Sequence, residues 1–432
     1  MFRESHCARS VRQQARRPVV AFTAIALSFA APAGAAIRTW PGSSPCNTTL
    51  QACLDAADAG DIVEVASDGP IAGPVELFRK SLTLRAAAGF TPVFEANSST
   101  NVIDAFGADT LVAIVIEGLT VRGGTINAYQ AGTGPFGLTI RGNTVEADGL
   151  DANRTGIRLG TFGSTPTGPV NFAIVDNDVN LGFLQGDDIS AIGIEDLPGS
   201  TIGVIDGNTV GNGGTFSTLS AIRVRNNIGS VDLQVSRNSV AAVGYNGGIL
   251  LIQEGSGSTL DAHVFDNLVT GTVGLTGPQP GAISLIASAG ALHADVLSNT
   301  LAGNHTGFIA SAAAGASIDG MLANTVVANN GTRGVVIDAT IAGDFANEHN
   351  LVFGNGSNDF TPGAGTVLAD PRFVGAQDFR LRGNSPARDA GNTVLAAGIS
   401  VDLGGAPRVF GPAVDIGAWE LGDSIFANGF DA

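Results

Sequence analysis

The sequence predicts an all-β protein folded as a parallel β-solenoid, a rod in which short repeats stack on one another and share one core. Three observations predict this fold. Glycine supplies 60 of the 432 residues, and each helical glycine costs about 1 kcal/mol relative to alanine, which excludes a helical protein. An asparagine motif recurs through the middle of the chain. Short segments with apolar residues at alternate positions, as in strands, flank most copies of this motif.

The composition excludes two other classes of Gly-rich protein. Hydrophobic residues make up 44% of the chain and charged residues only 14%, whereas disordered chains have few hydrophobic residues and high charge. The glycines do not occupy every third position, so a collagen triple helix is excluded. A β-protein with many turns remains.

Residues 1–36 have the three parts of a secretory signal peptide. Five arginines form a basic region, the apolar run 19–31 follows, and small residues lead to a cleavage point near Ala35 or Ala36. A membrane anchor is the alternative, but this run is too short to cross a bilayer comfortably. No later stretch is long and apolar enough to do so. We therefore expect a secreted protein, extracellular or on the cell surface, that is not an integral membrane protein.

The charge of the chain limits its partners. The formal net charge is −17, and without residues 1–36, which carry five Arg and one Glu, it is −21. Nucleic acid is excluded as a partner, because phosphate binding requires a basic surface. An acidic polysaccharide is repelled at long range unless a cation or a local Arg cluster intervenes. We expect a monomer.

Two cysteines remain after the signal peptide. Cys46 and Cys53 form an even pair in an oxidising compartment, and we expect them to form a disulfide that closes a short loop. A metal site is the alternative, but no histidine lies near them in the sequence.

The asparagine motif, Asn followed two residues later by Val or Leu, recurs every 25 to 34 residues. Such a unit is too small to bury its apolar side alone, so the copies must stack. A propeller blade needs four strands in about 40–50 residues, more than these units hold. We expect each asparagine at a corner of the chain, where Asn tolerates left-handed backbone and its amide bonds the next coil in a structural ladder. The copies begin at Asn143, Asn177, Asn208, Asn238, Asn267, Asn299 and Asn324, with a variant at Asn350.

The start of the chain adds a resemblance to a known family. Leu50, Cys53, Leu54 and Ala57 have helical spacing, and a Gly60-Asp61 turn and short strands follow. This order resembles the opening of right-handed parallel β-helix proteins of the pectate-lyase-like superfamily. The resemblance implies a right-handed, single-stranded parallel β-helix whose first coil is capped by an N-terminal amphipathic helix.

The end of the chain resembles the closing segment of many secreted bacterial β-helix proteins. The segments that carry this resemblance are 370–373, 378–381, 385–391 and 414–420, with Asp402 and Arg408 between the last two. We predict a β-helix over residues 37–421, including a cap at 37–60 and a closing segment at 366–421. Residues 422–432 form a tail that is either a sorting tag or an unstructured end. The resemblance implies a secreted bacterial protein, but the family is functionally mixed and does not determine the activity.

Four charged residues are candidates for a site on an outer face. When the strands are aligned, Arg158, Gly193 and Arg223 share one outward position on successive coils, and Glu195 and Arg225 share the next. Coils in a parallel ladder lie about 4.8 Å apart, so Glu195 and Arg225 are expected to pair. One interpretation is a mixed subsite that grips a sugar or uronate. The other is an exposed ion pair that contributes at most about 1 kcal/mol.

Two adjacent carboxylates, Asp187 and Asp188, follow a glycine. Paired carboxylates act as general acid and base in glycoside hydrolysis, and this tripeptide resembles a motif of polygalacturonases. The other motifs of those enzymes are absent from the sequence. An acidic turn is the alternative interpretation.

Lyase chemistry is the other route open to this fold. β-Elimination needs a base and a cation or Arg that neutralises the uronate carboxylate, so Ca²⁺ is the cofactor expected if the protein is a lyase. The only lysine, Lys80, lies in a segment that we interpret as structural. Arg158, Arg223 or Arg225 therefore remain as candidates for the base. The sequence thus supports two hypotheses, a polysaccharide-binding lyase or hydrolase and a non-catalytic adhesin or surface scaffold.

Overall fold

The computed structural model describes residues 34–96, 101–146, 155–161, 168–180, 185–186, 190–211, 216–241, 245–274 and 281–422. Of the predicted signal peptide, residues 1–36, only the last three belong to this part of the chain. The predicted tail lies outside it except for its first residue.

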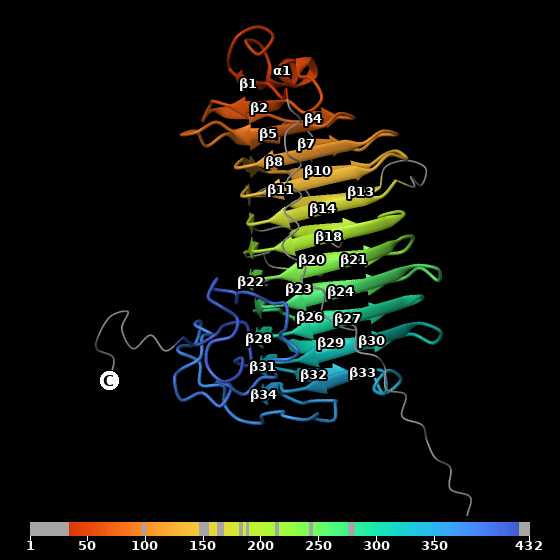
Figure 1. Ribbon diagram of the computed structural model, residues 1–432, viewed down its shortest axis with the longest axis vertical. Helices are drawn as coiled ribbons and strands as arrows, with labels where there is room; N and C mark the ends of the chain where they lie inside the picture. Colours follow the sequence, from red (N-terminus) through yellow and green to blue (C-terminus); the bar gives the residue numbers. More distant parts are fainter. Residues whose placement is uncertain are drawn as a thin grey trace, which may run out of the picture.

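The chain forms a parallel β-solenoid with three sheets, which confirms the predicted fold class (Figure 1). The chain passes repeatedly through sheet A, sheet B and sheet C in that order. Sheet A consists of β1 (Ile37–Trp40), β2 (Ile62–Val65), β5 (Leu82–Ala86), β8 (Val112–Glu117), β11 (Phe136–Arg141), β14 (Val170–Val175), β18 (Ser200–Asp206), β21 (Ser230–Ser236), β24 (Thr259–Phe265), β27 (Ala291–Leu297), β30 (Ser317–Ala323) and β33 (Phe345–Glu348).

The remaining strands form sheets B and C. Sheet B consists of β3 (Pro70–Ala72), β6 (Val93–Glu95), β9 (Thr120–Arg122), β12 (Thr144–Glu146), β15 (Asp178–Asn180), β19 (Thr209–Val210), β22 (Ser239–Ala241), β25 (Leu268–Thr270), β28 (Thr300–Ala302), β31 (Val326–Ala328) and β34 (Leu351–Phe353). Sheet C consists of β4 (Val75–Phe78), β7 (Asn101–Phe106), β10 (Thr125–Gln130), β13 (Ile157–Thr161), β16 (Gln185–Gly186), β17 (Ile192–Glu195), β20 (Phe216–Asn226), β23 (Tyr245–Gln253), β26 (Ile283–Ala287), β29 (Thr306–Ala312) and β32 (Arg333–Ile337).

Alternate residues of each strand point into one continuous core. In sheet A, for example, Ile116, Ile140, Ile174 and Ile205 occupy the same inward position on successive coils and are fully buried. Burial of each such side chain contributes about 1.5–3 kcal/mol. Because every coil has apolar residues at the same inward positions, the core runs the length of the rod. The outward positions do not take part in the core and are available for binding or catalysis.

The first coil is capped by the predicted helix, α1 (Leu50–Ala56). The Thr49 hydroxyl accepts a hydrogen bond from the Ala52 N–H at 3.1 Å, which caps the helix N-terminus. Leu50, Cys53 and Leu54 are buried against the first coil. The predicted disulfide between Cys46 and Cys53 is present. No helix in the described part of the chain has the length and apolar character that a bilayer crossing requires.

The corner between sheets A and B carries a ladder of buried asparagines. From Asn143 to Asn267, each amide Nδ2 donates to the Oδ1 of the asparagine on the next coil at 2.9–3.0 Å, and the backbone N–H donates to the same oxygen. Each Nδ2 also donates to a backbone carbonyl of the preceding coil. All the members are at most 1% exposed. The ladder consists of Asn143, Asn177, Asn208, Asn238, Asn267 and Asn299.

The structure differs from the expectation in the backbone of this corner. The left-handed conformation belongs to the residue before each ladder position, such as Gly142 (φ 61°) or Asp176 (φ 54°). Asn324 occupies this preceding position (φ 50°), so it is not in the ladder. Thr325 takes its place there, accepting from the Asn299 N–H at 3.2 Å and donating its own N–H to Asn350. The Asn324 side chain instead bonds the backbone of Asn392 at 2.7 and 3.0 Å.

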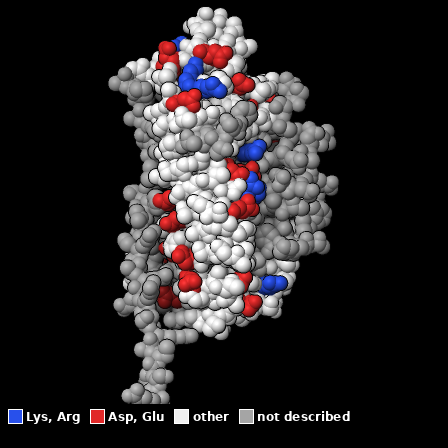
Figure 2. All heavy atoms as spheres, turned by 90° about the vertical axis from the view of Figure 1, so that its right-hand side faces the viewer, with Lys and Arg blue, Asp and Glu red and all other residues white. Residues whose placement is uncertain are grey.

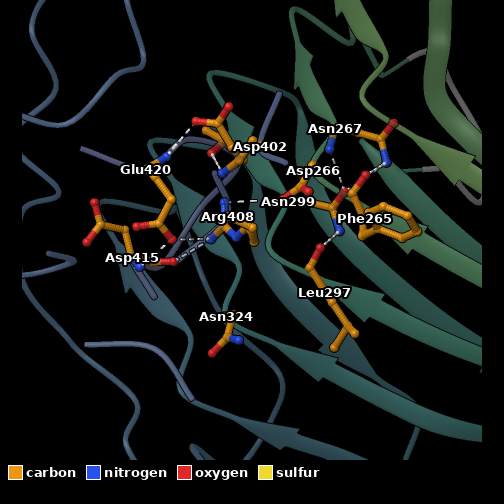
Figure 3. Close-up of polar contacts among 12 residues, drawn as sticks. Phe265, Asp266, Asn267, Leu297, Asn299, Asn324, Asp402, Arg408, Asp415 and Glu420 are labelled. Atoms are coloured by element: carbon orange, nitrogen blue, oxygen red, sulfur yellow. Dashed lines mark hydrogen bonds and ion pairs between the residues drawn. The ribbon is translucent and has the colours of Figure 1, made fainter. Parts of the chain in front are cut away.

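The closing segment folds back along the last coils instead of continuing them (Figure 1). The Ala418 N–H donates to the Thr300 hydroxyl in β28 at 3.0 Å. The Arg408 side chain reaches into the A–B corner (Figure 3), where its Nη1 lies 3.3 Å from Asp266 Oδ1 and its Nη2 lies 3.4 Å from Glu420 Oε1. This segment therefore covers the outside of several coils and is attached to them by buried charges.

Candidate functional site

The outer face of sheet C holds the most varied side chains of the early coils. In β4, β7, β10 and β13, one outward position forms a polar row, because these residues pair directly in the strand register. Two residues further along the first three strands, the next outward position forms an aromatic row. The polar row consists of Glu76, Asp104, Asn127 and Arg158, and the aromatic row of Phe78, Phe106 and Tyr129.

The aromatic rings pack against one another along the rod. The Phe78 and Phe106 ring centroids lie 5.4 Å apart at 64°, and those of Phe106 and Tyr129 lie 5.5 Å apart at 26°. The Arg79 guanidinium carbon lies 4.7 Å from the Phe78 ring centroid. Because the three rings pack against one another, the row presents an apolar edge to a ligand. Most of this edge belongs to Phe78, which is 49% exposed.

Asp104 is the most unusual group on this face. It is only 7% exposed, although it points outward. Burial raises the pKa of its carboxyl group, and the charge of Glu76 adds to this rise; hydrogen bonds from the Asn101 amide, at 3.0 and 3.3 Å, and a contact from the Asn127 amide oppose it. On the next coil, Asn127 is 2% exposed, and its Nδ2 makes no well-aligned hydrogen bond. A carboxyl group held toward its protonated form is a typical component of a functional site.

The four sequence-predicted charged residues lie together on the next coils of this face. Glu195 accepts from Arg223 at 2.7 Å and from Arg158 at 3.4 Å. Glu195 and Arg225 are register partners as expected, but the expected ion pair between them is absent. Arg225 instead donates to Asp196 at 2.5 Å, because Asp196 follows directly after β17 and lies within reach. We call these five residues the arginine network.

The other two sequence-predicted carboxylates, Asp187 and Asp188, lie outside the described residues. Glu195 does not take their place as a partner of Asp104. Glu195 lies in β17 and Asp104 in β7, and these strands are separated by β10 and β13. The two residues are therefore about 14 Å apart along the rod. The paired carboxyl groups of glycosidases lie about 5–9.5 Å apart, so these two do not form such a pair.

The described face does not fit a calcium site. No group of three or more His, Cys, Asp or Glu side chains that is arranged to hold a metal occurs in the described ranges. After Glu76 and Asp104, the next positions of the polar row are an amide and a guanidinium, and a cation is repelled by the latter.

Sheet B has a cavity of its own. About 480 Å³ in volume, it is lined by Glu95, Ala96, Arg122, Gly123 and Glu146. Arg122 Nε lies 3.0 Å from Glu146 Oε2, and Glu95 is the register partner of Arg122 on the other side. The guanidinium is thus already flanked by two carboxylates, which leaves it little free charge for an anionic ligand.

Elsewhere on the surface, basic side chains also lie beside acidic ones (Figure 2). On the side shown in Figure 2, basic side chains are few and each group of them touches acidic ones. Further acidic side chains follow the left edge of this view without basic neighbours. A surface of this kind repels polyanions at long range.

Sequence reasoning missed Glu76 and Asp104. A usable signal was present, since Asp104 is a single acid inside the otherwise apolar strand Val102 to Phe106. An ionisable residue at such a place needs a compensating reason.

Comparisons with known proteins agree with the fold. No family model and no curated protein matches this sequence. Among solved structures, pectate lyase Pel9A matches with a TM-score of 0.56 at 14% identity, over 89% of this chain and 96% of that chain. The complex of XylC with xylose matches with a TM-score of 0.43 at 11% identity, over 87% and 96%. At 14% identity, the likeness to pectate lyase Pel9A shows a shared fold.

Proposed function

We propose that this protein is an exported bacterial protein that binds and processes extracellular polysaccharide along the outer face of sheet C, from β4 to β20. One observation carries this proposal: on that face a nearly buried carboxyl group, Asp104, lies between the exposed Glu76 and the buried amide of Asn127. Carboxyl groups with perturbed pKa values cluster at functional sites, so the raised pKa of Asp104 on an outer face supports this proposal.

The neighbouring residues suit a long carbohydrate ligand. The polar row runs along the rod axis across four coils, so successive sugar units meet an acid, an amide and a guanidinium. The aromatic row beside it supplies an apolar edge for the C–H groups of a sugar ring. Arg158 has a 44% exposed side chain, so it remains able to donate to a sugar hydroxyl or carboxylate.

Export is supported by residues 1–36, which have the composition of a signal peptide. The disulfide in the N-terminal cap supports an oxidising environment. Pectate lyase Pel9A has a similar fold. Because one fold can host several functions, the proposal depends on the residues of the outer face of sheet C and not on the fold.

A non-catalytic adhesin or scaffold is the second candidate function. The arginine network favours it, because its three arginines already pair with acidic side chains, namely Glu195, Asp196 and the neighbouring Glu254. Contacts of this kind stabilise a surface by about 1 kcal/mol or less without any ligand. An adhesin of this type has no reaction product.

A binding screen tests the proposal. The purified protein is mixed with insoluble neutral and uronate-rich polysaccharides, with and without Ca²⁺, and the bound fraction, reducing ends and unsaturated-uronate absorbance are measured. Phe78→Ala on sheet C is expected to weaken binding at least about threefold, whereas the matched control Phe353→Ala, a similarly exposed ring in β34 of sheet B, leaves it unchanged. Equal loss in both variants, or no binding of any polysaccharide, would contradict the proposal.

A further inference from the structure

Glu76 and Asp104 form a pair of carboxyl groups on adjacent coils. They are register partners in β4 and β7 and occupy the same outward position. Neighbouring strands lie about 4.8 Å apart, and side chains at one position point in the same direction, so this register allows a separation of about 5 Å between the two carboxyl groups. Retaining glycoside hydrolases hold their two carboxyl groups at about 5–5.5 Å, whereas inverting enzymes need about 6.5–9.5 Å to admit a water molecule.

The two carboxyl groups have opposite environments. Asp104 is 7% exposed, and burial, opposed by Asn101 and aided by the charge of Glu76, raises its pKa. Glu76 is exposed to solvent. Such a difference assigns the roles of acid and nucleophile in a carboxyl pair, because one group keeps its proton while the other remains ionised.

A third group points to a ligand at the same place. Asn127, the register partner of Asp104 on the following coil, is 2% exposed; its Nδ2 lies close enough to the Asp104 carboxyl group to oppose the rise of that pKa, but the contact is not a well-aligned hydrogen bond. A buried amide donor without a good acceptor is costly unless something supplies the acceptor. A sugar hydroxyl oxygen over the carboxyl pair would do so.

The helix α1 holds the nucleophile in place. Gln51 accepts from the Glu76 N–H at 2.9 Å and donates to the Glu76 carbonyl at 3.1 Å. Both backbone groups of Glu76 are therefore fixed by one side chain from the cap. Such positioning is what a nucleophile requires, since small displacements reduce the rate strongly.

The substrate class follows from charge. Two carboxyl groups in contact with the glycosidic bond and a net charge of −17 disfavour a polyuronate. A neutral glycan meets no such repulsion, and its C–H groups suit the apolar edge of the aromatic row two residues away on the same strands.

Resting on the function proposed above, we propose that Glu76 and Asp104 are the nucleophile and the proton donor of a retaining glycoside hydrolase that cleaves a neutral polysaccharide. In the first step a Glu76 carboxylate oxygen bonds to the anomeric carbon and the glycosidic C–O bond breaks. Its electron pair goes to the leaving oxygen, which takes the proton of Asp104. In the second step Asp104 takes a proton from water, whose oxygen bonds to the anomeric carbon and releases Glu76.

Hydrolysis of neutral glycans by the full exported chain tests this assignment. The probes are β-glucan, xylan, mannan and galactan, together with aryl glycosides of their oligosaccharides. Asp104→Asn is expected to lower kcat on the polysaccharide about 10²–10⁴-fold, and much less on an aryl glycoside whose leaving group needs no proton. Glu76→Ala is expected to lose hydrolysis and to regain turnover with azide, yielding a glycosyl azide. The matched control Glu95→Gln, a carboxylate on sheet B, retains the wild-type rate.

The outcomes separate this inference from the proposed function. If polysaccharide binds, with Phe78→Ala weakening it, but no neutral glycan is cut, the inference fails and the binding function stands. If an unsaturated uronate appears instead, the protein is a lyase and the carboxyl pair is not its catalytic pair. Two results together would show that the two residues act structurally. Azide would fail to restore turnover in Glu76→Ala, and Asp104→Asn would lower kcat equally on the polysaccharide and on the aryl glycoside. If no polysaccharide binds, both proposals fail.

Discussion

Arg408 Nη1 lies 3.3 Å from Asp266 Oδ1, and both side chains are fully inaccessible to solvent. Arg408 belongs to the closing segment and Asp266 to the A–B corner of an earlier coil, so this contact attaches the end of the chain to the rod (Figure 3). Burial raises the pKa of Asp266 well above its usual range, although Arg408 opposes the rise. The Arg408 Nη2 also donates to the Asp415 carbonyl at 2.7 Å.

Removal of this arginine is expected to be costly. Arg408→Met removes the charge that lies 3.3 Å from Asp266 and 3.4 Å from Glu420, and the loss of one partner of a buried ion pair typically destabilises a protein by about 3–5 kcal/mol. The free energy of unfolding from denaturant titration measures the loss. Adding Asp266→Asn is expected to restore part of it, and Arg380→Met, which removes a 64% exposed arginine, is expected to change little. A loss below about 1 kcal/mol for Arg408→Met would show that the closing segment is held by other contacts.

Glu420 predicts a pH dependence of stability. Burial, opposed by Arg408, raises its pKa from 4.5 to about 7. Between these values the folded protein keeps a proton that the unfolded chain has lost, so the free energy of unfolding falls as the pH rises from about 4.5 to 7. Glu420→Gln is expected to remove this contribution, at most about 3 kcal/mol, and so to flatten the curve of Tm against pH. Identical slopes in wild type, Glu420→Gln and the exposed control Glu146→Gln would rule it out.

His293 predicts a second pH effect in a higher range. Contacts with Asp295 and Asp319 raise its pKa from 6.5 to about 10. The stability that the charged imidazole provides is complete below about 6.5 and is lost as the pH rises through 10. The difference in Tm between wild type and His293→Gln is therefore expected to shrink from pH 6 to pH 10. A constant difference over this range would contradict the ion pairing.

The asparagine ladder is expected to be the most sensitive part of the outer corner. Asn208→Ala removes hydrogen bonds to Asn238 and to the Ile174 carbonyl, and it leaves the Asn177 amide without its acceptor. Each buried group left unpaired costs about 1–3 kcal/mol, so a total loss of about 3 kcal/mol or more is expected in denaturant unfolding. Asn227→Ala, at an exposed turn position, is expected to stay within about 0.5 kcal/mol of wild type. Similar values for both would mean that the ladder is not a source of stability.

The fold was predictable because the repeat encodes it. From Asn143 onward, an asparagine, an alternating strand and a turn recur at a regular spacing, so spacing alone indicates the solenoid and its asparagine ladder. Asn324 shows the limit of this reasoning. The motif Asn-x-Val is preserved there, but the chain is shifted by one residue, and only the backbone reveals that Thr325 takes the ladder position.

The candidate site was less accessible to sequence reasoning. Aligning strands predicted the register of Glu195 and Arg225 correctly, but an ion pair depends on side-chain reach, and Asp196 lies nearer to Arg225. Glu76 and Asp104 belong to early coils that precede the asparagine repeat, so no motif aligned them. Their proximity follows from the pairing of β4 with β7.

The configuration of the first product shows whether Glu76 and Asp104 act as a retaining pair. Proton NMR during hydrolysis of a neutral oligosaccharide distinguishes the anomers before they interconvert. Carboxyl groups on adjacent coils, as at Glu76 and Asp104, predict a product with the same anomeric configuration as the substrate. A product of inverted configuration would contradict this assignment, because inversion requires a wider separation that admits a water molecule between the two carboxyl groups.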